Sequence, residues 1–397
     1  MSLLEFVRKE SKAIAADVVK WRRHLHANPE LSYQETNTVK FVAQTLREMG
    51  LTPQEGIAGT GLTVLIEGKN PSKKVFALRA DMDALPIQQV SDKPYRSKND
   101  GVMHACGHDV HTSSLLGTAR ILNGAKQQFE GTIKMLFQPG EEKNPGGASM
   151  MIRDGALKNP APSGIIGQHV MPLLPVGTVG FREGMYMASS DEIYLKVIGK
   201  GGHAAAPELI IDPVLIASHI IIGLQQVISR QANPRQATVL SFGKVRAEGA
   251  TNVIPDEVTI AGTFRALDES WRELALKKIE KMAQGIAESM GGRCEVVISR
   301  GYPYLENNAG LTRRIRLAAE EYLGKDKVVD LDITLGSEDF AYYSHVIPAS
   351  FYRLGTRNDA KGITSYVHTP TFDIDEDALA IGPGLMAWMA IRELAQQ

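Results

Sequence analysis

The chain has 397 residues, and its 44 lysines and arginines nearly balance 45 acidic residues, leaving a net charge of −1. This length exceeds what one ordinary hydrophobic core supports, so we expect two domains. Because no excess of positive charge is available to neutralise phosphates, nucleic acid is excluded as an expected partner. A small-molecule substrate is favoured instead.

The N-terminal segment 1–21 has the charge pattern of an amphipathic helix and lacks the uninterrupted apolar run of a signal peptide. The longest apolar stretch, 214–224, is interrupted by Ser218 and His219, and we expect it to be too short to span a membrane. The two cysteines, Cys106 and Cys294, lie far apart, which argues against a disulfide framework. We therefore expect a cytoplasmic protein without a membrane partner.

From residue 60 onward, short apolar runs alternate with segments of helical periodicity. The predicted strands are 61–68, 74–80, 131–137 and 164–168, and the predicted helix is 110–124. Strands that alternate with helices predict an α/β domain with a mixed, largely parallel sheet flanked by helices.

The pattern changes after residue 183. A strand, a helix, two strands, a helix and a strand are predicted in that order, at 192–198, 212–230, 238–245, 258–265, 270–290 and 294–299. This βαββαβ order is typical of the ferredoxin-like α+β fold. We expect residues 183–302 to form an inserted second domain, and residues 1–182 and 303–397 to form the catalytic domain. Strand-like segments at 333–336 and 350–354 and a helix at 378–394 complete the chain.

Side chains of the types that bind metals follow the predicted strands or precede the predicted helices. They are Asp81 and Asp83, residues 104–109, Glu141 and Glu142, His169, and His368. Each has an ordinary explanation when taken alone, such as a helix cap, a buried thiol or a solvated helical turn. Because sites in open α/β sheets form beyond the carboxyl ends of the strands, we expect these segments to converge.

The residue types in this set suit a borderline metal ion. Zinc accepts thiolate, imidazole and carboxylate ligands and leaves a position for water. One cysteine, three histidines and one glutamate exceed the needs of a single catalytic zinc and could supply two ions. Two metals about 3.5–4 Å apart can share a hydroxide and stabilise a tetrahedral intermediate. Of two adjacent glutamates, one can face the metal while its neighbour takes a proton from water.

Several ordered motifs carry a family resemblance across nearly the whole chain. They are residues 21–32, 79–86, 104–109, 138–142, 201–204, 251–255 and 336–340. The sequence resembles the dinuclear-metal aminoacylase/carboxypeptidase family. Within it, the most similar branch contains hippurate hydrolases, indole-acetyl-amino-acid hydrolases and bacterial N-acyl-L-amino-acid amidohydrolases. The Cys106-x-His108 pair is specific to that branch, since most other members have a bridging aspartate there.

This resemblance implies a site with two divalent metal ions per subunit. The implied ligands are Cys106, His108, Glu142, His169 and His368. Glu141 would be the general base, and Asp83 would support the metal site from behind its ligands. The thiolate favours zinc, although manganese, cobalt or nickel could support activity.

The resemblance also implies that the inserted domain is a lid that forms a homodimer or a higher homo-oligomer. His203 would reach the partner's active site and stabilise the oxyanion, and it joins Glu141 and Asp83 in the expected catalytic set. Asn252 and Arg265 would hold the substrate's α-carboxylate, which suits a planar guanidinium. The implied reaction is hydrolysis of the amide bond of N-acetyl, N-benzoyl or other N-acyl L-amino acids, with a metal-bound hydroxide as nucleophile.

Three alternatives stay open from the sequence. A carboxypeptidase or dipeptidase would use the same site chemistry. A cysteine hydrolase with Cys106 as nucleophile would leave Glu141, Glu142, His169 and His368 without a role. A non-catalytic metal- or ligand-binding protein would not require Glu141.

Other histidines and cysteines are expected to have structural roles. His104 and His111 flank the Cys-x-His pair but are not expected to bind metal. We expect His24 and His26 to pack or hydrogen-bond locally, and Cys294 to act as a small buried hydrophobe.

Overall fold

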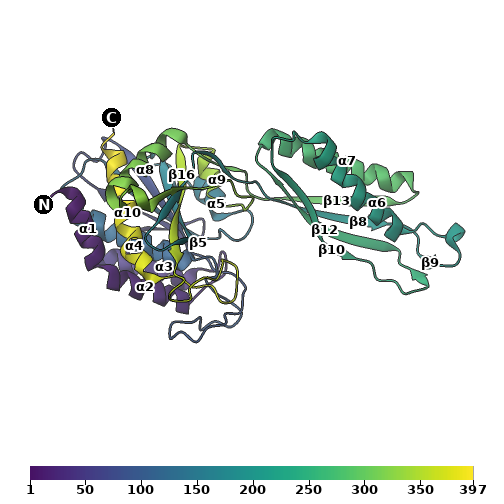
Figure 1. Cartoon of the computed structure of the whole chain (residues 1–397), viewed down its shortest axis with the longest axis horizontal. Helices are drawn as coiled ribbons and strands as arrows, with labels where there is room; N and C mark the ends of the chain where they lie inside the picture. Colours follow the sequence, from purple (N-terminus) through teal and green to yellow (C-terminus); the bar gives the residue numbers. More distant parts are fainter. Residues whose placement is uncertain (397) are drawn as a thin grey trace. The chain divides into compact units, whose positions relative to one another are not determined.

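The computed structural model describes residues 1–396 and divides into two compact units (Figure 1). Unit 1 comprises Met1–Tyr186, Glu306–Ile333 and the chain from Asp339, and unit 2 comprises Met187–Leu305 with Thr334–Glu338. The segment predicted as an inserted domain, 183–302, therefore overlaps unit 2. Unit 2 also includes a short segment, 334–338, that the sequence pattern did not assign to it.

An eight-stranded mixed sheet forms the centre of unit 1, in the order β1-β2-β4-β3-β5-β16-β6-β15. Its central strands β4, β3, β5 and β16 run parallel, and β15 runs parallel to β6. The antiparallel pairs are β1 with β2, β2 with β4, and β6 with β16. The α/β class with a largely parallel sheet is thus confirmed. The strands are β1 (Gln54–Ile57), β2 (Gly61–Glu67), β3 (Val75–Asp81), β4 (Thr132–Gln138), β5 (Ile165–Pro175), β6 (Val179–Phe181), β15 (Val328–Asp330) and β16 (Ala349–Arg357).

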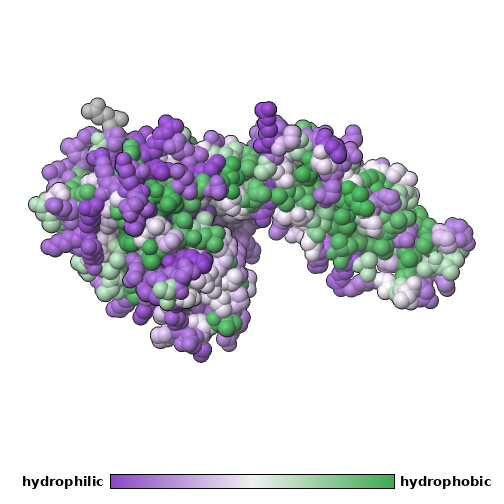
Figure 2. Space-filling view, in the orientation of Figure 1, coloured by the Kyte–Doolittle hydropathy of each residue, from purple (hydrophilic) through white to green (hydrophobic). Residues whose placement is uncertain are grey.

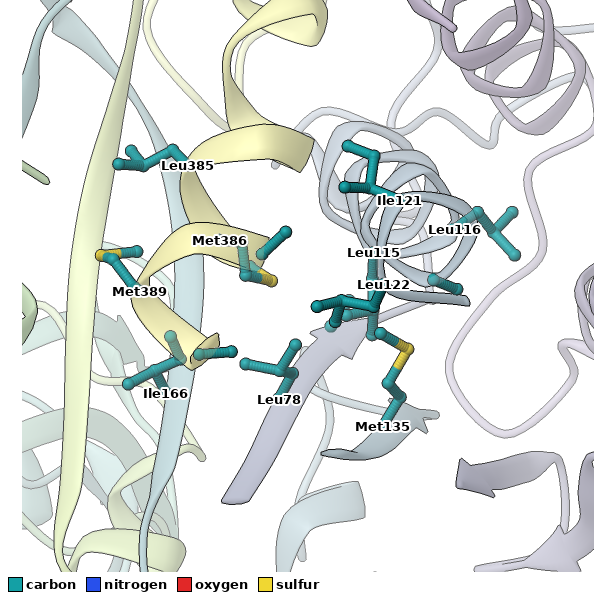
Figure 3. Close-up of a cluster of buried hydrophobic side chains, with 14 of the residues drawn as sticks. Leu78, Leu115, Leu116, Ile121, Leu122, Met135, Ile166, Leu385, Met386 and Met389 are labelled. Carbon is teal, nitrogen blue, oxygen red and sulfur yellow. The ribbon is translucent and has the colours of Figure 1, made fainter. Parts of the chain in front are cut away.

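The helices of unit 1 pack on this sheet and on one another. Leu115 and Leu122 of α4 lie in the same buried cluster as Met386 and Met389 of α10, and Leu78 of β3 contributes to it (Figure 3). Each such fully buried side chain contributes roughly 1.5–3 kcal/mol. The helices are α1 (Leu3–Ala13), α2 (Ala15–Ala27), α3 (Thr36–Glu48), α4 (His108–Ala125), α5 (Gly147–Arg153), α8 (Ala309–Leu323), α9 (Ala341–Ser344) and α10 (Gly382–Leu394).

Unit 2 has the predicted βαββαβ order, and its antiparallel sheet has the strand order β10-β12-β8-β13. Alternate residues of β8, namely Ile193, Leu195 and Val197, are buried in the core that α6 and α7 share with the sheet. The elements are β8 (Asp191–Ile198), α6 (Pro213–Gln226), β10 (Thr238–Arg246), β12 (Glu257–Ala266), α7 (Glu269–Ser289) and β13 (Arg293–Arg300). Two small ribbons pair β9 (Gly202–His203) with β11 (Val253–Ile254), and β7 (Gly184–Met187) with β14 (Leu305–Asn307).

Helix α6 continues through the π-helical turn Val227–Gln231, so the helical run Pro213–Gln231 has 19 residues. In the part of the chain that the structure describes, it is the one helix whose length and composition would allow it to cross a membrane. This helical run is longer than the apolar stretch 214–224 within it and matches the helix predicted at 212–230. Ile216, Ile220 and Leu224 of this run belong to the core of unit 2.

Three further predictions need correction. Residues 333–336 form no strand and only a single bridge, between Thr334 and Met187. The N-terminal helix is broken at Ile14 into α1 and α2. The closing helix begins only at Gly382, after a separate 3₁₀ turn, because Pro383 lacks an amide hydrogen and is tolerated only in the first turn.

Candidate metal centre

The candidate metal-binding side chains leave one end of the unit 1 sheet. Strands β3 and β4 are parallel, and their last residues, Asp81 and Gln138, are partners in the register. Asp83 and Glu141 follow these two strand ends directly. Gly107 has φ 82° and precedes α4, which places Cys106 and His108 on either side of the turn that starts the helix.

Among the groups of three potential ligand atoms that form there, two share the thiol of Cys106. The ligand atoms of Cys106, His108 and His169 lie within 4.8 Å of one another, and so do those of Cys106, Glu142 and His368. Cys106 Sγ is 3.4 Å from His169 Nε2 and 3.3 Å from His368 Nε2. His368 Nε2 is also 3.3 Å from Glu142 Oε1. The five residues predicted as ligands therefore lie together, with Cys106 between the two groups.

In two of these histidines, the other ring nitrogen, Nδ1, is hydrogen-bonded to the protein. His108 Nδ1 lies 3.1 Å from the Asp83 carboxylate and 2.9 Å from the Asp83 carbonyl oxygen. His169 Nδ1 donates to the Val170 carbonyl oxygen at 2.7 Å. Each ring is thereby fixed with Nε2 as its available nitrogen, which is how proteins commonly orient a metal-binding histidine.

Asp83 connects several parts of this arrangement. Its carboxylate accepts hydrogen bonds from the Ser32 hydroxyl at 2.6 Å and from the Glu142 amide at 2.9 Å. Burial raises the pKa of Asp83, but the hydrogen bond and charge of His108 outweigh burial and hold that pKa below its usual value. Asp83 thus stays an anion that orients both His108 and the Glu142 backbone.

The residues fit a cation by a further observation. His108 Nε2 is buried and makes no hydrogen bond within residues 1–396, and it lies 3.9 Å from Glu142 Oε1. A buried nitrogen without a partner costs about 1–3 kcal/mol, so a ligand at this position would relieve the cost. Thiolate, imidazole and carboxylate together are the donors that zinc accepts.

Glu141 is positioned differently from Glu142. It is 6% exposed, and the Asp339 amide donates to its Oε1 at 3.3 Å. Its carboxylate lies within 4.8 Å of the ligand atoms of His108 and Glu142. A carboxylate beside the ligands has the placement that a general base requires. This role, like the ligand roles, stays a prediction.

The neighbouring histidines have other partners or lie apart from both groups. His111 Nδ1 contacts Asp81 Oδ1 at 2.6 Å, and His111 Nε2 accepts the Val170 amide at 2.9 Å, so both ring nitrogens are engaged. His104 is in neither group of ligand atoms, and burial lowers its pKa to about 4. His24 stacks on Phe41, and His26 Nδ1 contacts Asp109 at 2.8 Å.

Both cysteines are in surroundings that disfavour the thiolate. Burial, and next the charge of Glu142, raise the pKa of Cys106. Burial raises the pKa of Cys294 to about 11, in keeping with a small hydrophobe. A cysteine hydrolase would leave Glu142 and His368, whose ligand atoms lie beside Cys106 Sγ, without a role.

Three residues predicted to contact substrate lie in unit 2. His203 and Asn252 are exposed and adjacent, because the Ala204 amide donates to the Asn252 carbonyl oxygen within the β9–β11 ribbon. Arg265 is half-buried on β12, where its guanidinium donates to the hydroxyls of Thr263 and Ser337 at 3.1 and 2.9 Å.

Sequence reasoning missed a buried network at the base of the site. Arg79, which is completely buried in β3, donates to Gln138 at 2.8 Å and to Asp81 and Asp339 at 2.7 Å each. The signal was present, since a charged residue interrupts an otherwise apolar strand. A buried arginine requires buried acids as partners. The sequence therefore indicates a charged network at this strand but not the function of the network.

Comparison with known proteins agrees with this arrangement. The chain is 39% identical over 386 residues to the N-acetylcysteine deacetylase of Bacillus subtilis, covering 96% of this chain and 97% of the relative. It is 38% identical over 395 residues to thermostable carboxypeptidase 2 of Saccharolobus solfataricus, with 99% of each chain covered. A solved dinuclear metal-binding peptidase of the M20 family from Bacillus subtilis superposes with a TM-score of 0.82 at 36% identity, covering 96% of this chain and 99% of that one.

The resemblance drawn from the motifs is confirmed by these likenesses. The sequence profile of Peptidase family M20/M25/M40 matches residues 77–391, which is most of the chain. The protein therefore belongs to Peptidase family M20/M25/M40 and is a metal-dependent hydrolase.

Proposed function

We propose that this protein hydrolyses the amide bond of N-acyl L-amino acids and releases a carboxylate and a free amino acid. The observation that carries the proposal is the pair of three-ligand groups that share Cys106, with the buried carboxylate of Glu141 beside them. The likeness to an enzyme named for removing an acetyl group from N-acetylcysteine supports an acylated amino acid as substrate.

In this proposal, Cys106, His108 and His169 hold one divalent ion, and Cys106, Glu142 and His368 hold the other. Zinc is the first candidate because of the thiol. When bound, the ions would polarise the scissile carbonyl group and acidify a water molecule. Asp83 fixes the imidazole of His108 so that Nε2 is directed at the site.

Glu141 performs the proton transfers. Its carboxylate takes a proton from the attacking water and then gives that proton to the nitrogen of the leaving amino acid. Because Glu141 is 6% exposed, bulk water has little access to the carboxylate during these steps. The charge that forms on the carbonyl oxygen would be stabilised by His203, and Asn252 and Arg265 would hold the α-carboxylate of the substrate.

We further propose that the protein is a homodimer formed through unit 2. Several large apolar side chains are exposed on α6, among them Leu215 at 52% and Ile222 at 73%. Figure 2 shows hydrophobic surface in the region of unit 2 where Figure 1 labels α6. Exposed apolar patches are typical of protein interfaces, and a dimer could supply His203 to the partner's site.

The test of the catalytic role is the Glu141→Gln variant assayed on N-acetyl and N-benzoyl amino acids. We expect elemental analysis to find two metal ions per subunit and kcat to fall by about 10²–10⁴-fold, the usual contribution of a general base. Glu67→Gln, which changes an exposed glutamate at the end of β2, serves as the control. Near-normal turnover by Glu141→Gln would refute the role of Glu141, and full activity without metal would refute the site.

A carboxypeptidase or dipeptidase is the second candidate, because a carboxypeptidase is among the similar proteins. Both reactions cleave an amide bond next to an amino acid with a free carboxylate, so the same ligands and base serve either. Rates on N-acyl amino acids and on dipeptides with the same C-terminal residue decide between them. A higher kcat/KM on the dipeptides would establish peptidase activity as the main function.

A further inference from the structure

Arg22 of α2 is completely buried and is surrounded by carboxylates. Its Nε lies 2.8 Å from Asp109 Oδ2, its Nη2 lies 2.8 Å from Asp373 Oδ1, and its Nη1 lies 3.4 Å from Glu376 Oε1. A guanidinium carries its charge at every ordinary pH, so these are permanent charge-assisted hydrogen bonds. None of these four residues belongs to the two groups of ligand atoms.

The carboxylates come from the two chain segments that carry candidate metal ligands. Asp109 directly follows His108 at the start of α4. Asp373 follows His368 on a segment, 364–375, that contains no helix or strand, and Glu376 begins the 3₁₀ turn directly after it. Arg22 thus ties the segment of His368 to the segment of Cys106 and His108.

His368 depends on such ties more than the other ligands do. Its residue adopts φ 61°, and its side chain is 51% exposed, whereas Cys106, His108 and His169 are buried on or beside regular elements. The His368 amide donates to the Ala105 carbonyl oxygen at 2.7 Å, which fixes one end of the segment. Arg22 fixes the other end through Asp373.

Tyr95 completes the arrangement around Arg22. Its hydroxyl donates to the second oxygen of Asp373 at 2.8 Å, and its ring lies 5.0 Å from the Arg22 guanidinium. Both oxygens of Asp373 are therefore occupied, one by Arg22 and one by Tyr95. This leaves the carboxylate little freedom to move.

We infer that Arg22 is a positioning residue that holds His368 against Cys106 and Glu142 and so completes the second group of metal ligands. The inference rests on the proposed metal site. Without the guanidinium, Asp109 would keep only its contact to His26 Nδ1, and Asp373 would keep its hydrogen bonds from Tyr95 and the Ile374 amide. Both carboxylates would lose the positive charge that compensates them, which is strongly unfavourable for a buried acid. We expect His368 to lose its fixed position against Cys106, whereas the buried side chains of Phe372 and Ile374 keep the rest of the segment on the core of unit 1.

The test is the metal content and metal affinity of Arg22→Met, measured by elemental analysis and by competition with a chromophoric zinc chelator. We expect the first ion to bind nearly as in the wild type, because His108 and His169 are also held by Asp83 and by the Val170 carbonyl oxygen. We expect the second ion to bind about 10–100-fold more weakly, the usual effect of removing a partner that orients a ligand. Arg22→Lys should recover part of this loss, since lysine keeps the charge but not the planar fork.

The matched control is Arg120→Met. Arg120 of α4 forms an arginine–aspartate ion pair with Asp17 of α2. Both side chains are half-exposed, and the pair involves neither Asp109 nor the segment of His368. We expect this variant to bind both ions normally. Thermal unfolding of each variant shows whether it is folded.

Asp373→Asn provides a second variant should Arg22→Met fail to fold, since it weakens the tie while leaving Arg22 paired with Asp109. A folded Arg22→Met or Asp373→Asn protein that binds both ions with wild-type affinity would overturn the inference. Equal weakening of both ions would also overturn it, because it would indicate a general effect on the fold. If the wild-type protein itself binds fewer than two ions, the proposed site fails rather than the role of Arg22.

Discussion

Asp83 illustrates how one side chain can control metal binding without being a ligand. It contacts His108 Nδ1 at 3.1 Å and accepts the amide of Glu142 at 2.9 Å, so it orients one proposed ligand from each group. We expect Asp83→Asn to weaken metal binding about 10–100-fold, because an amide lacks the charge that favours the donor form of His108 Nδ1. Titration with a competing chelator measures this change. Unaltered affinity would show that backbone contacts alone orient His108.

Cys106 lies between the two groups of ligand atoms, so its replacement should affect both ions. We expect Cys106→Ala to lose the second ion, because Cys106 Sγ is the ligand atom that the two groups share. Cys106→Asp should bind two ions but favour manganese over zinc relative to the wild type, since a carboxylate is a harder ligand than a thiolate. Activity and metal content after reconstitution with each metal would check this. Cys106→Ala binding both ions normally would contradict the shared position.

At the scale of single residues, the sequence predicted the metal-binding residues, whose types are specific to that chemistry. It missed the buried arginines, because arginine has many other roles in proteins. A cysteine two residues before a histidine at a helix start is a rare pattern, and it drew attention to Cys106 and His108. Arg22 and Arg79 are completely buried, yet arginines are usually exposed, so their sequence positions alone did not indicate burial. Only the structure shows which acids surround them.

Among the elements, the turn before α4 is the one on which the site most depends. Gly107 has φ 82°, and a Cβ there would lie 2.6 Å from Val170 Cγ2, next to His169. Gly107→Ala should therefore destabilise the fold by more than the roughly 1–2 kcal/mol of a left-handed residue, and it should also lower metal affinity. Gly101→Ala is the control, because Gly101 has φ 74° and no atom within 4 Å of a Cβ. Denaturant unfolding measures the loss of unfolding free energy in each variant. Gly101→Ala reports the backbone strain alone, so a larger loss in Gly107→Ala measures the clash with Val170. Equal losses in the two variants would show that Val170 moves aside.

Most elements were predictable because their patterns repeat with the period of a helix or a strand. The predicted strand 192–198 differs from β8 by one residue. His169 was expected after a strand of 164–168, but β5 continues to Pro175, because hydrogen bonds with β16 extend beyond the apolar run that marked it. Residues 333–336 were apolar enough to suggest a strand, but they form only one bridge, to Met187 at the end of β7, and no ladder.

At the scale of the whole molecule, the approach of His368 to Cys106 spans 262 residues and could not be derived from spacing. The strand order places both residues at one end of the sheet only after the chain has passed through unit 2 and returned. The family resemblance supplied this pairing, whereas periodicity supplied the elements. The dimer and the position of His203 relative to a metal stay predictions, because each unit is described separately.

Metal removal should act on one unit more than the other. All five proposed ligands lie in unit 1, and unit 2 has its own hydrophobic core. A ligand at a hundred times its Kd stabilises the folded state by about 2.7 kcal/mol, which for a unit of this size raises the Tm by roughly 5 °C. We expect calorimetry to show that chelation lowers the unfolding temperature of unit 1 by at least this amount and that zinc restores it. Magnesium should not restore it, because it binds thiolate and imidazole poorly. If chelation lowers the unfolding temperature of every calorimetric transition equally, the two units unfold together instead.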